Sequence, residues 1–139
     1  MKPTHYQLAG MVAVLVVFGC QSLPNTTKTG RVIEVPIVNS EKIDDVAVHR
    51  GDEVRWVNKR RAPVRVVLID PELDKRVSCS NHFGGFMKPR DTAELMTNQS
   101  ASICFNEEGL FKYVVRMDST RETGEINVPG TIKVGEQGG

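Results

Sequence analysis

Three side chains with affinity for copper lie close together in the middle of the chain. Cys79, His82 and Met87 supply a thiol, an imidazole and a thioether in the spacing Cys-x2-His-x4-Met. A mononuclear copper site for electron transfer needs two imidazoles and a thiolate in a trigonal set, with a weak axial methionine. The stretch contains three of these ligands. His49 is the candidate for the second imidazole, because His5 lies in an N-terminal segment that we expect to be removed.

The N-terminus carries the pattern of an export signal. Lys2 is followed by an apolar run from Leu8 to Phe18, which is far shorter than the roughly 20 residues that span a bilayer. The run ends in Val17-Phe18-Gly19-Cys20, which resembles the bacterial lipobox, where small residues precede a cysteine that becomes acylated. We therefore predict a signal peptide over residues 1–19 and lipidation at Cys20. The alternative is an ordinary secretory signal with an incidental cysteine.

The residue after Cys20 and the overall charge bear on location and partners. Gln21, rather than Asp, resembles the sorting signal of outer-membrane lipoproteins in two-membrane bacteria, so we expect the protein on the periplasmic face of that membrane. The chain has 18 basic and 17 acidic residues, and removal of Lys2 with the signal leaves equal numbers. A neutral chain without long runs of like charge is not expected to bind nucleic acid. Residues 20–30 are predicted to form the acylated cysteine and a flexible tether.

Export also changes the chemistry expected of the remaining cysteines. Besides Cys20, the exported chain has Cys79 and Cys104, and exported cysteine pairs are usually oxidised. A bond closing about 25 residues would contribute roughly 3 kcal/mol on the chain-entropy estimate. We expect this disulfide. The alternative is a free Cys79 thiolate that binds copper.

The rest of the sequence favours one domain of short strands. The chain has 139 residues, 40% of them hydrophobic, with 12 Gly and 7 Pro, which suits strands joined by turns. Strand patterns cover residues 31–38, 46–48, 53–58, 64–70, 92–96, 101–105, 110–117, 126–128 and 131–134. We predict an all-β fold, an antiparallel Greek-key β-sandwich of about eight strands over residues 31–135, with a tail at 136–139.

Alternation within these strands predicts which side chains are buried. Ile33, Val35 and Ile37 form the inward face of the first strand, and Pro36 suits an edge strand because it lacks an N–H. Trp56 is the largest candidate for the core. The inward face of residues 110–117 is predicted to be Phe111, Tyr113, Val115 and Met117.

Three segments resemble the cupredoxin family of plastocyanin and azurin. The segment from Val48 to Asn58, followed by Pro63, is similar to that family's Gly-Asp-x-Val-x-Trp/Phe-x-Asn and then Pro-His. Gly109 to Val115 is similar to its Gly-x-Tyr-x-Phe/Tyr-x-Cys strand, and Gly130 to Val134 resembles its closing Gly-x-Ile/Val-x-Val strand. The resemblance covers residues 31–134 and implies a cupredoxin-like sandwich.

The same resemblance bears on type 1 copper. Val64 stands where the family's first His would follow Pro63, and Val115 stands at the position of its Cys. Residues 116–129 contain no His, so the resemblance implies that the standard copper positions are lost. Copper would then need Cys79, His82, Met87 and His49, or weak Cu(I) binding through the imidazoles and thioether alone.

The sequence contains few groups of residues that could act together as catalytic acids, bases or nucleophiles. Asp70, Glu72 and Asp74 surround Pro71 and are interpreted as a solvated turn, because no His, Lys or metal set accompanies them in the sequence. The segment Ser78–Ser80 has no nucleophile-elbow context. We therefore do not expect an enzyme.

Two functional hypotheses follow from these patterns. The first is a binding or structural role, in which Phe83 and Phe86 would form an apolar surface for an envelope partner; the alternative for both phenylalanines is core packing. The second is a copper-binding electron carrier or copper chaperone that uses the Cys79, His82 and Met87 stretch. For the first we expect no cofactor, and for the second we expect copper.

Overall fold

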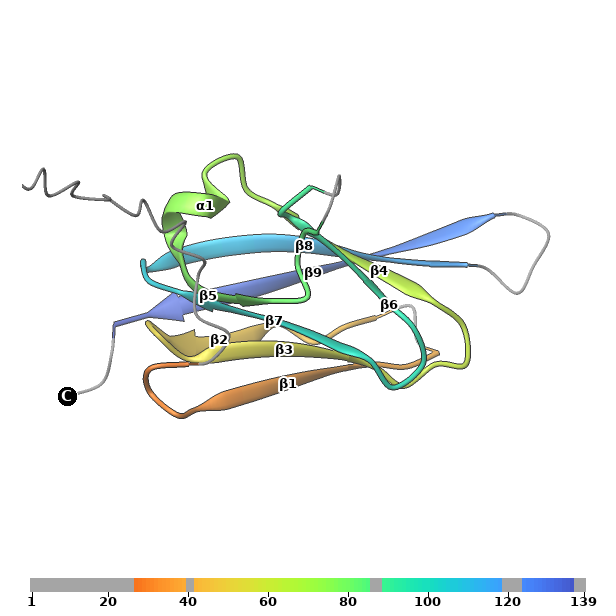
Figure 1. Cartoon of the computed structure of the whole chain (residues 1–139), viewed down its shortest axis with the longest axis horizontal. Helices are drawn as coiled ribbons and strands as arrows, with labels where there is room; N and C mark the ends of the chain where they lie inside the picture. The colour runs from red at the N-terminus through yellow and green to blue at the C-terminus, as the bar shows by residue number, and fades with distance from the viewer. Residues whose placement is uncertain (1–26, 40–41, 86–88, 119–123, 137–139) are drawn as a thin grey trace, which may run out of the picture.

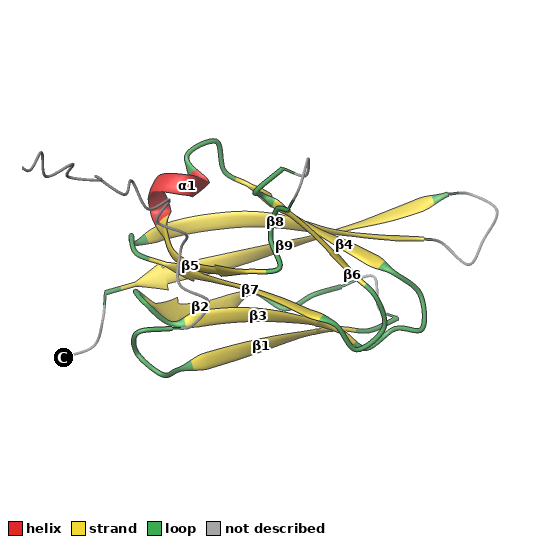
Figure 2. Cartoon of the chain, in the orientation of Figure 1, coloured by secondary structure: helices red, strands yellow, loops and turns green. Residues whose placement is uncertain are grey.

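Two packed β-sheets make up the domain. The structure is a computed structural model that describes residues 27–39, 42–85, 89–118 and 124–136, and Figure 1 shows the two layers. The elements in chain order are β1 (Val32–Ile37), β2 (Val46–His49), β3 (Glu53–Asn58), β4 (Val64–Ile69), α1 (Leu73–Arg76), β5 (Val77–Asn81), β6 (Thr92–Leu95), β7 (Ser100–Phe105), β8 (Gly109–Asp118) and β9 (Glu125–Gly135). Strands dominate the described residues, with α1 as the single short helix among them (Figure 2). No helix in these ranges is long and apolar enough to cross a membrane.

The chain crosses between the sheets at nearly every connection. One sheet has the order β1-β3-β7-β5 and the other β2-β9-β8-β4-β6, so β1 to β8 alternate between the two. The predicted β-sandwich is confirmed. The pairing is not purely antiparallel, because β1 runs parallel to β3 and β2 runs parallel to β9. Direct hairpins force antiparallel pairing, and neither of these pairs consists of consecutive strands.

Two elements differ from the predicted ones. The region after Pro71, for which no strand was predicted, contains α1 and β5, and β5 pairs with the distant strand β7. The two strands predicted over residues 126–128 and 131–134 are one continuous strand, β9. Pro129 is accommodated there because β2 pairs with β9 only from Ile132 onward, which leaves no ladder partner in β2 opposite the missing N–H.

The core has the composition that the alternation predicted. Val35 and Ile37 on β1 are buried, with Ile33 partly so, and β1 is an edge strand, as Pro36 indicated. The inward face of β8 is buried in full: Phe111, Tyr113, Val115 and Met117. Trp56 is fully buried and packs edge-to-face on Tyr113, with ring centroids 5.2 Å apart.

Gly130 makes room for one of these rings. It lies opposite Tyr113 in the β8–β9 ladder, and a Cβ at this glycine would come within 2.2 Å of the Tyr113 Cζ atom. The tyrosine ring therefore lies directly against the glycine backbone, which ties the two strands closely together.

Candidate functional site

The two cysteines other than Cys20 are joined in the structure. Cys79 on β5 lies opposite Cys104 on β7, their Cα atoms are 4.8 Å apart, and the sulfurs form a disulfide. The predicted disulfide is confirmed. The hypothesis that Cys79 is a copper thiolate is wrong for this state, because its sulfur is already bonded and a thiolate is the form that binds metal.

The other predicted ligands are not assembled around that sulfur. His82 directly follows β5, at one edge of the four-stranded sheet, while His49 ends β2, which lies beside β1 at the opposite side of the sandwich. Met87 lies outside the described residues, as do Cys20 and Phe86. Within the described ranges, no group of three or more His, Cys, Asp or Glu side chains could hold a metal ion.

The two valines at which the sequence resemblance would place copper ligands are part of the core. Val64 on β4 and Val115 on β8 are both buried, and Met117 lies directly opposite Val64 in the β4–β8 ladder. Hydrocarbon side chains cannot coordinate a metal ion. This part of the sandwich is packed with apolar groups.

Phe83 follows the core-packing alternative rather than forming an exposed patch. Its ring packs edge-to-face on Trp56, with centroids 5.6 Å apart, and it is partly buried against the main core. His82 just before it is exposed and has a positive φ of 68°, a conformation typical of a tight turn. The turn therefore directs the Phe83 ring back onto the core.

One of the three carboxylates around Pro71 holds the end of α1 in place. Asp70 accepts a hydrogen bond from Arg76 Nη1 at 2.9 Å, and the same guanidinium lies 4.2 Å from the Phe111 ring centroid. Glu72 and Asp74 are exposed, as the solvated-turn interpretation expects. Asp70 does not fit the solvated-turn interpretation, because its side chain is largely buried in the ion pair with Arg76.

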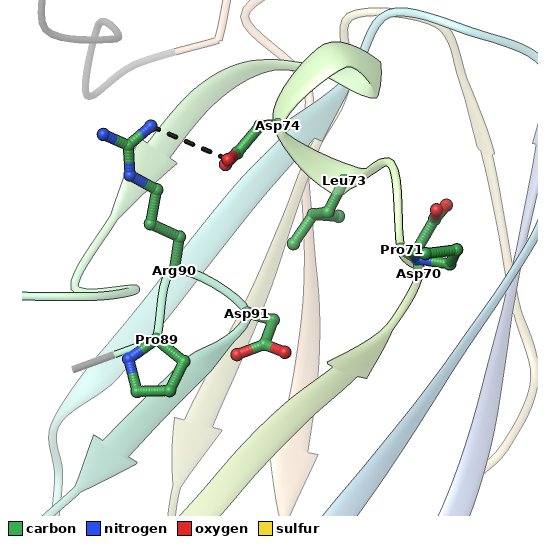
Figure 3. Close-up of a pocket in the computed structure, with 7 residues that line it drawn as sticks. All are labelled: Asp70, Pro71, Leu73, Asp74, Pro89, Arg90 and Asp91. Carbon is green, nitrogen blue, oxygen red and sulfur yellow. Dashed lines mark ion pairs between the residues drawn. The ribbon is translucent and has the colours of Figure 1, made fainter.

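A small pocket lies beside these carboxylates. Its volume is about 290 Å³, and Figure 3 shows its lining residues: Asp70, Pro71, Leu73, Asp74, Pro89, Arg90 and Asp91. Asp74 pairs with Arg90 at 3.8 Å, and Asp91 accepts a hydrogen bond from the Thr92 hydroxyl at 3.0 Å. Each acid already has a partner, so the pocket presents no free acid–base pair.

A larger cleft lies between the edge strands β1 and β2. Its volume is about 600 Å³, and its floor is apolar: Ile33, Val35, Ile43 and Val46. Among the described residues of its lining, three are acidic and one is a lysine: Glu34, Asp44, Asp45 and Lys42. No feature of the sequence predicted this cleft. The edge signal of Pro36 identified β1 as an edge, but nothing in the sequence places β2 next to it.

Asp52 is the most deeply buried acid with converging partners. It is 1% exposed, its Oδ2 accepts a hydrogen bond from the His49 backbone N–H at 3.0 Å, and its Oδ1 accepts one from the Thr29 hydroxyl at 2.8 Å. Arg31 Nε lies 3.7 Å away. Burial by itself raises the pKa of Asp52, but these hydrogen bonds and the Arg31 charge outweigh it and hold the pKa below its usual value.

In the sequence, this acid is recognisable only as part of a turn and of the segment that resembles the cupredoxin motif. The structure shows that it joins the segment predicted to be a tether, residues 20–30, to the start of β3. Thr27 and Thr29, which precede residue 31, therefore already contact the turn formed by Gly51 and Asp52. The sequence feature that corresponds to these contacts of Asp52 is an aspartate directly after Gly51, together with the threonines Thr27 and Thr29 earlier in the chain.

Comparison with known proteins adds a likeness of fold. No family model matches the chain, and no curated protein matches it. The solved structure of amicyanin from Paracoccus versutus is 19% identical, with 75% of this chain and 81% of that chain covered and a TM-score of 0.46. A reduced Cu(I) form of an amicyanin variant is 18% identical, with 75% and 82% covered and a TM-score of 0.48. At these identities and TM-scores, the likeness does not assign the chain to a family.

Proposed function

We propose that this chain is an acylated lipoprotein of the bacterial envelope whose cupredoxin-like domain has a binding or structural role and works without type 1 copper. The observation that supports this most directly is the Cys79–Cys104 disulfide. It uses the sulfur on which a relocated copper site would depend. The buried valines at positions 64 and 115 and the separation of His49 from His82 support the same proposal.

Membrane attachment in this proposal is supplied by lipid on Cys20. Acyl chains contribute about 0.8 kcal/mol per buried methylene, and several chains on one cysteine hold a domain firmly at a bilayer. We expect Cys20→Ser to move the protein from the membrane fraction to the soluble fraction of the periplasm. Unchanged partitioning of this variant would exclude lipidation as the anchor.

The binding role is best supported by the cleft between β1 and β2. We propose that it takes an extended segment of an envelope protein with apolar side chains flanked by lysine or arginine. The apolar floor of the cleft suits the apolar side chains of such a segment. The carboxylates of Glu34, Asp44 and Asp45 suit its lysine or arginine side chains. β2 is an edge strand, and an edge strand has main-chain groups available for a further strand.

A photo-crosslinking amino acid at Ala47, an exposed position in the cleft, tests this binding role in cells. We expect one discrete protein adduct, which should disappear when Asp44 and Asp45 are replaced by Lys. The matched control places the crosslinker at Asn127, an exposed position on β9. Equal adducts at both positions, or an adduct indifferent to the charge reversal, would refute the cleft as the binding surface.

An anaerobic copper titration of the Cys20→Ser protein tests the metal part of the proposal. We expect no stoichiometric binding and no intense thiolate-to-copper absorption, because the thiol is in a disulfide. A strong band at one copper per chain would favour the alternative, an electron carrier or copper chaperone that uses the stretch around His82 and Met87. Replacement of both His82 and Met87 would then identify the ligands.

A further inference from the structure

The segment that leads to the proposed lipid joins the domain at one defined end. The Thr27 hydroxyl donates to the Gly51 carbonyl, and the Thr29 hydroxyl binds Asp52, in the turn between β2 and β3. Between Cys20 and Thr27 the chain can reach about 25 Å when fully extended, at roughly 3.5 Å per residue. This end of the sandwich, which we call the tether end, therefore cannot lie far from the lipid.

Two exposed apolar side chains lie at the tether end on the outer face of the five-stranded sheet. Ile69 and Leu110 are 56% and 59% exposed. Ile69 is opposite Lys112 in the β4–β8 ladder, and Leu110 is opposite Lys133 in the β8–β9 ladder. Lys133 in turn pairs with Ala47 on β2, close to the turn that holds the tether. Figure 1 shows the start of β8 and the end of β9 at the same end of the molecule as the start of β3.

Two lysines flank this apolar pair on the same face of the sheet. Lys112 and Lys133 are exposed, and neither has an ion pair to the described residues. The acids of the adjacent turn are already engaged: Glu107 with Arg76 at 3.1 Å and Glu108 with Arg50 at 3.8 Å. Glu136 beyond β9 is exposed and offsets part of the positive charge. In a contact between this face and another surface, the two apolar side chains would therefore contribute more than the lysines.

We infer that the corner formed by Ile69, Leu110, Lys112 and Lys133 lies on the lipid surface to which the chain is anchored. This rests on the proposed acylation of Cys20. Leu110 and Ile69 enter the headgroup region, and the lysines extend their alkyl stems along it toward lipid phosphates. The short tether keeps the corner at high effective concentration near the bilayer, so a weak contact is sufficient.

This orientation has a consequence for the rest of the molecule. The turn that contains Asn98 binds Asn58 at the end of β3, with Asn98 N donating to Asn58 O at 2.8 Å. Because β3 runs from the tether end to Asn58, this turn lies at the opposite end of the sandwich. Met96 beside it is 52% exposed. It therefore points away from the membrane and supplies a control of similar exposure and polarity.

Fluorescence of single tryptophan replacements in the lipidated full-length protein tests the inference. Leu110→Trp and Met96→Trp are each reconstituted in vesicles of phosphatidylethanolamine and phosphatidylglycerol, with and without brominated acyl chains as quenchers. The native Trp56 is fully buried and provides a constant background. We expect a blue shift and bromolipid quenching for the Leu110 replacement and neither for the Met96 replacement.

Charge provides the second readout. A lysine near an anionic surface contributes about 1 kcal/mol, or about fivefold in the ratio of contacting to detached domains. Lys112→Gln and Lys133→Gln, or vesicles of phosphatidylcholine alone, should therefore reduce the quenching of the Leu110 replacement.

The outcomes separate the two proposals. Protein that does not co-sediment with vesicles overturns acylation of Cys20, and with it the inference built on it. Protein that co-sediments but shows equal quenching at both positions, or none, overturns only the lipid contact. A shift of the Leu110 replacement that needs envelope extract rather than lipid also overturns it and assigns the corner to a protein partner.

Discussion

Removal of the disulfide should destabilise the domain by an amount that the structure allows us to estimate. Cys79 and Cys104 are separated by 25 residues in the sequence, and a loop of that length corresponds to about 3 kcal/mol of lost chain entropy in the unfolded state. For a domain of this size, 1 kcal/mol shifts the melting temperature by about 4 °C, so Cys104→Ala should lower it by about 12 °C. The disulfide also ties the edge strand β5 to β7, so local opening should increase there first.

The assay combines calorimetry with thiol labelling. Cys79→Ala and Cys104→Ala should each lower the melting temperature by similar amounts, and the double variant should cost little more, because all three remove the same bond. The Cys104 variant should expose one reactive thiol when it unfolds. A loss below about 1 kcal/mol, or strictly additive losses in the double variant, would refute the reasoning.

The same variant is a stringent test of the copper hypothesis. Cys104→Ala frees the Cys79 thiol without removing any predicted ligand. Because His49 ends β2 and His82 follows β5, at opposite sides of the sandwich, we expect no intense thiolate-to-copper band even then. Such a band would mean that the stretch after β5 rearranges to build a site once the disulfide is absent.

Three further predictions follow from the buried polar groups, the core and the N-terminus. The pKa of Asp52 is lower in the folded than in the unfolded protein, so the ionised carboxylate stabilises the domain at pH values above the unfolded pKa. This contribution is lost as the pH falls through the folded pKa. Below about pH 4, the melting temperature should therefore decline less steeply for Asp52→Asn than for the parent protein. Gly130→Ala should cost about 3 kcal/mol in urea unfolding, because its Cβ would clash with the Tyr113 ring. Gly135→Ala on the same strand is the control, since its Cβ meets nothing closer than 3.9 Å, and equal costs would contradict the packing argument. Gln21→Asp should leave the lipid in place but move the protein from the outer to the inner membrane on a density gradient; an unchanged distribution would remove the sorting prediction.

Local features of the sequence were sufficient to predict the layers and faces of the domain. The period-2 alternation from Phe111 to Met117 predicted which side of β8 is buried, because side chains on a strand point alternately to the two faces whatever the strand pairs with. Pro36 likewise predicted an edge position for β1, because it has no N–H to give to a second neighbour. The cysteine pair was predicted by elimination, since only two cysteines remain besides Cys20.

Pairing between distant segments was decided only by the tertiary structure. β5 escaped prediction because Val77–Asn81 is short and contains two serines, and it becomes a strand through its partner β7, more than 20 residues away. The parallel pairs, the cleft between β1 and β2, and the wide separation of His49 from His82 all depend on which edges meet, which periodicity does not encode. Asp52 is the clearest example: its position in a turn was visible in the sequence, but its burial and its bonds to Thr29 and Arg31 arise only when the incoming segment packs against that turn.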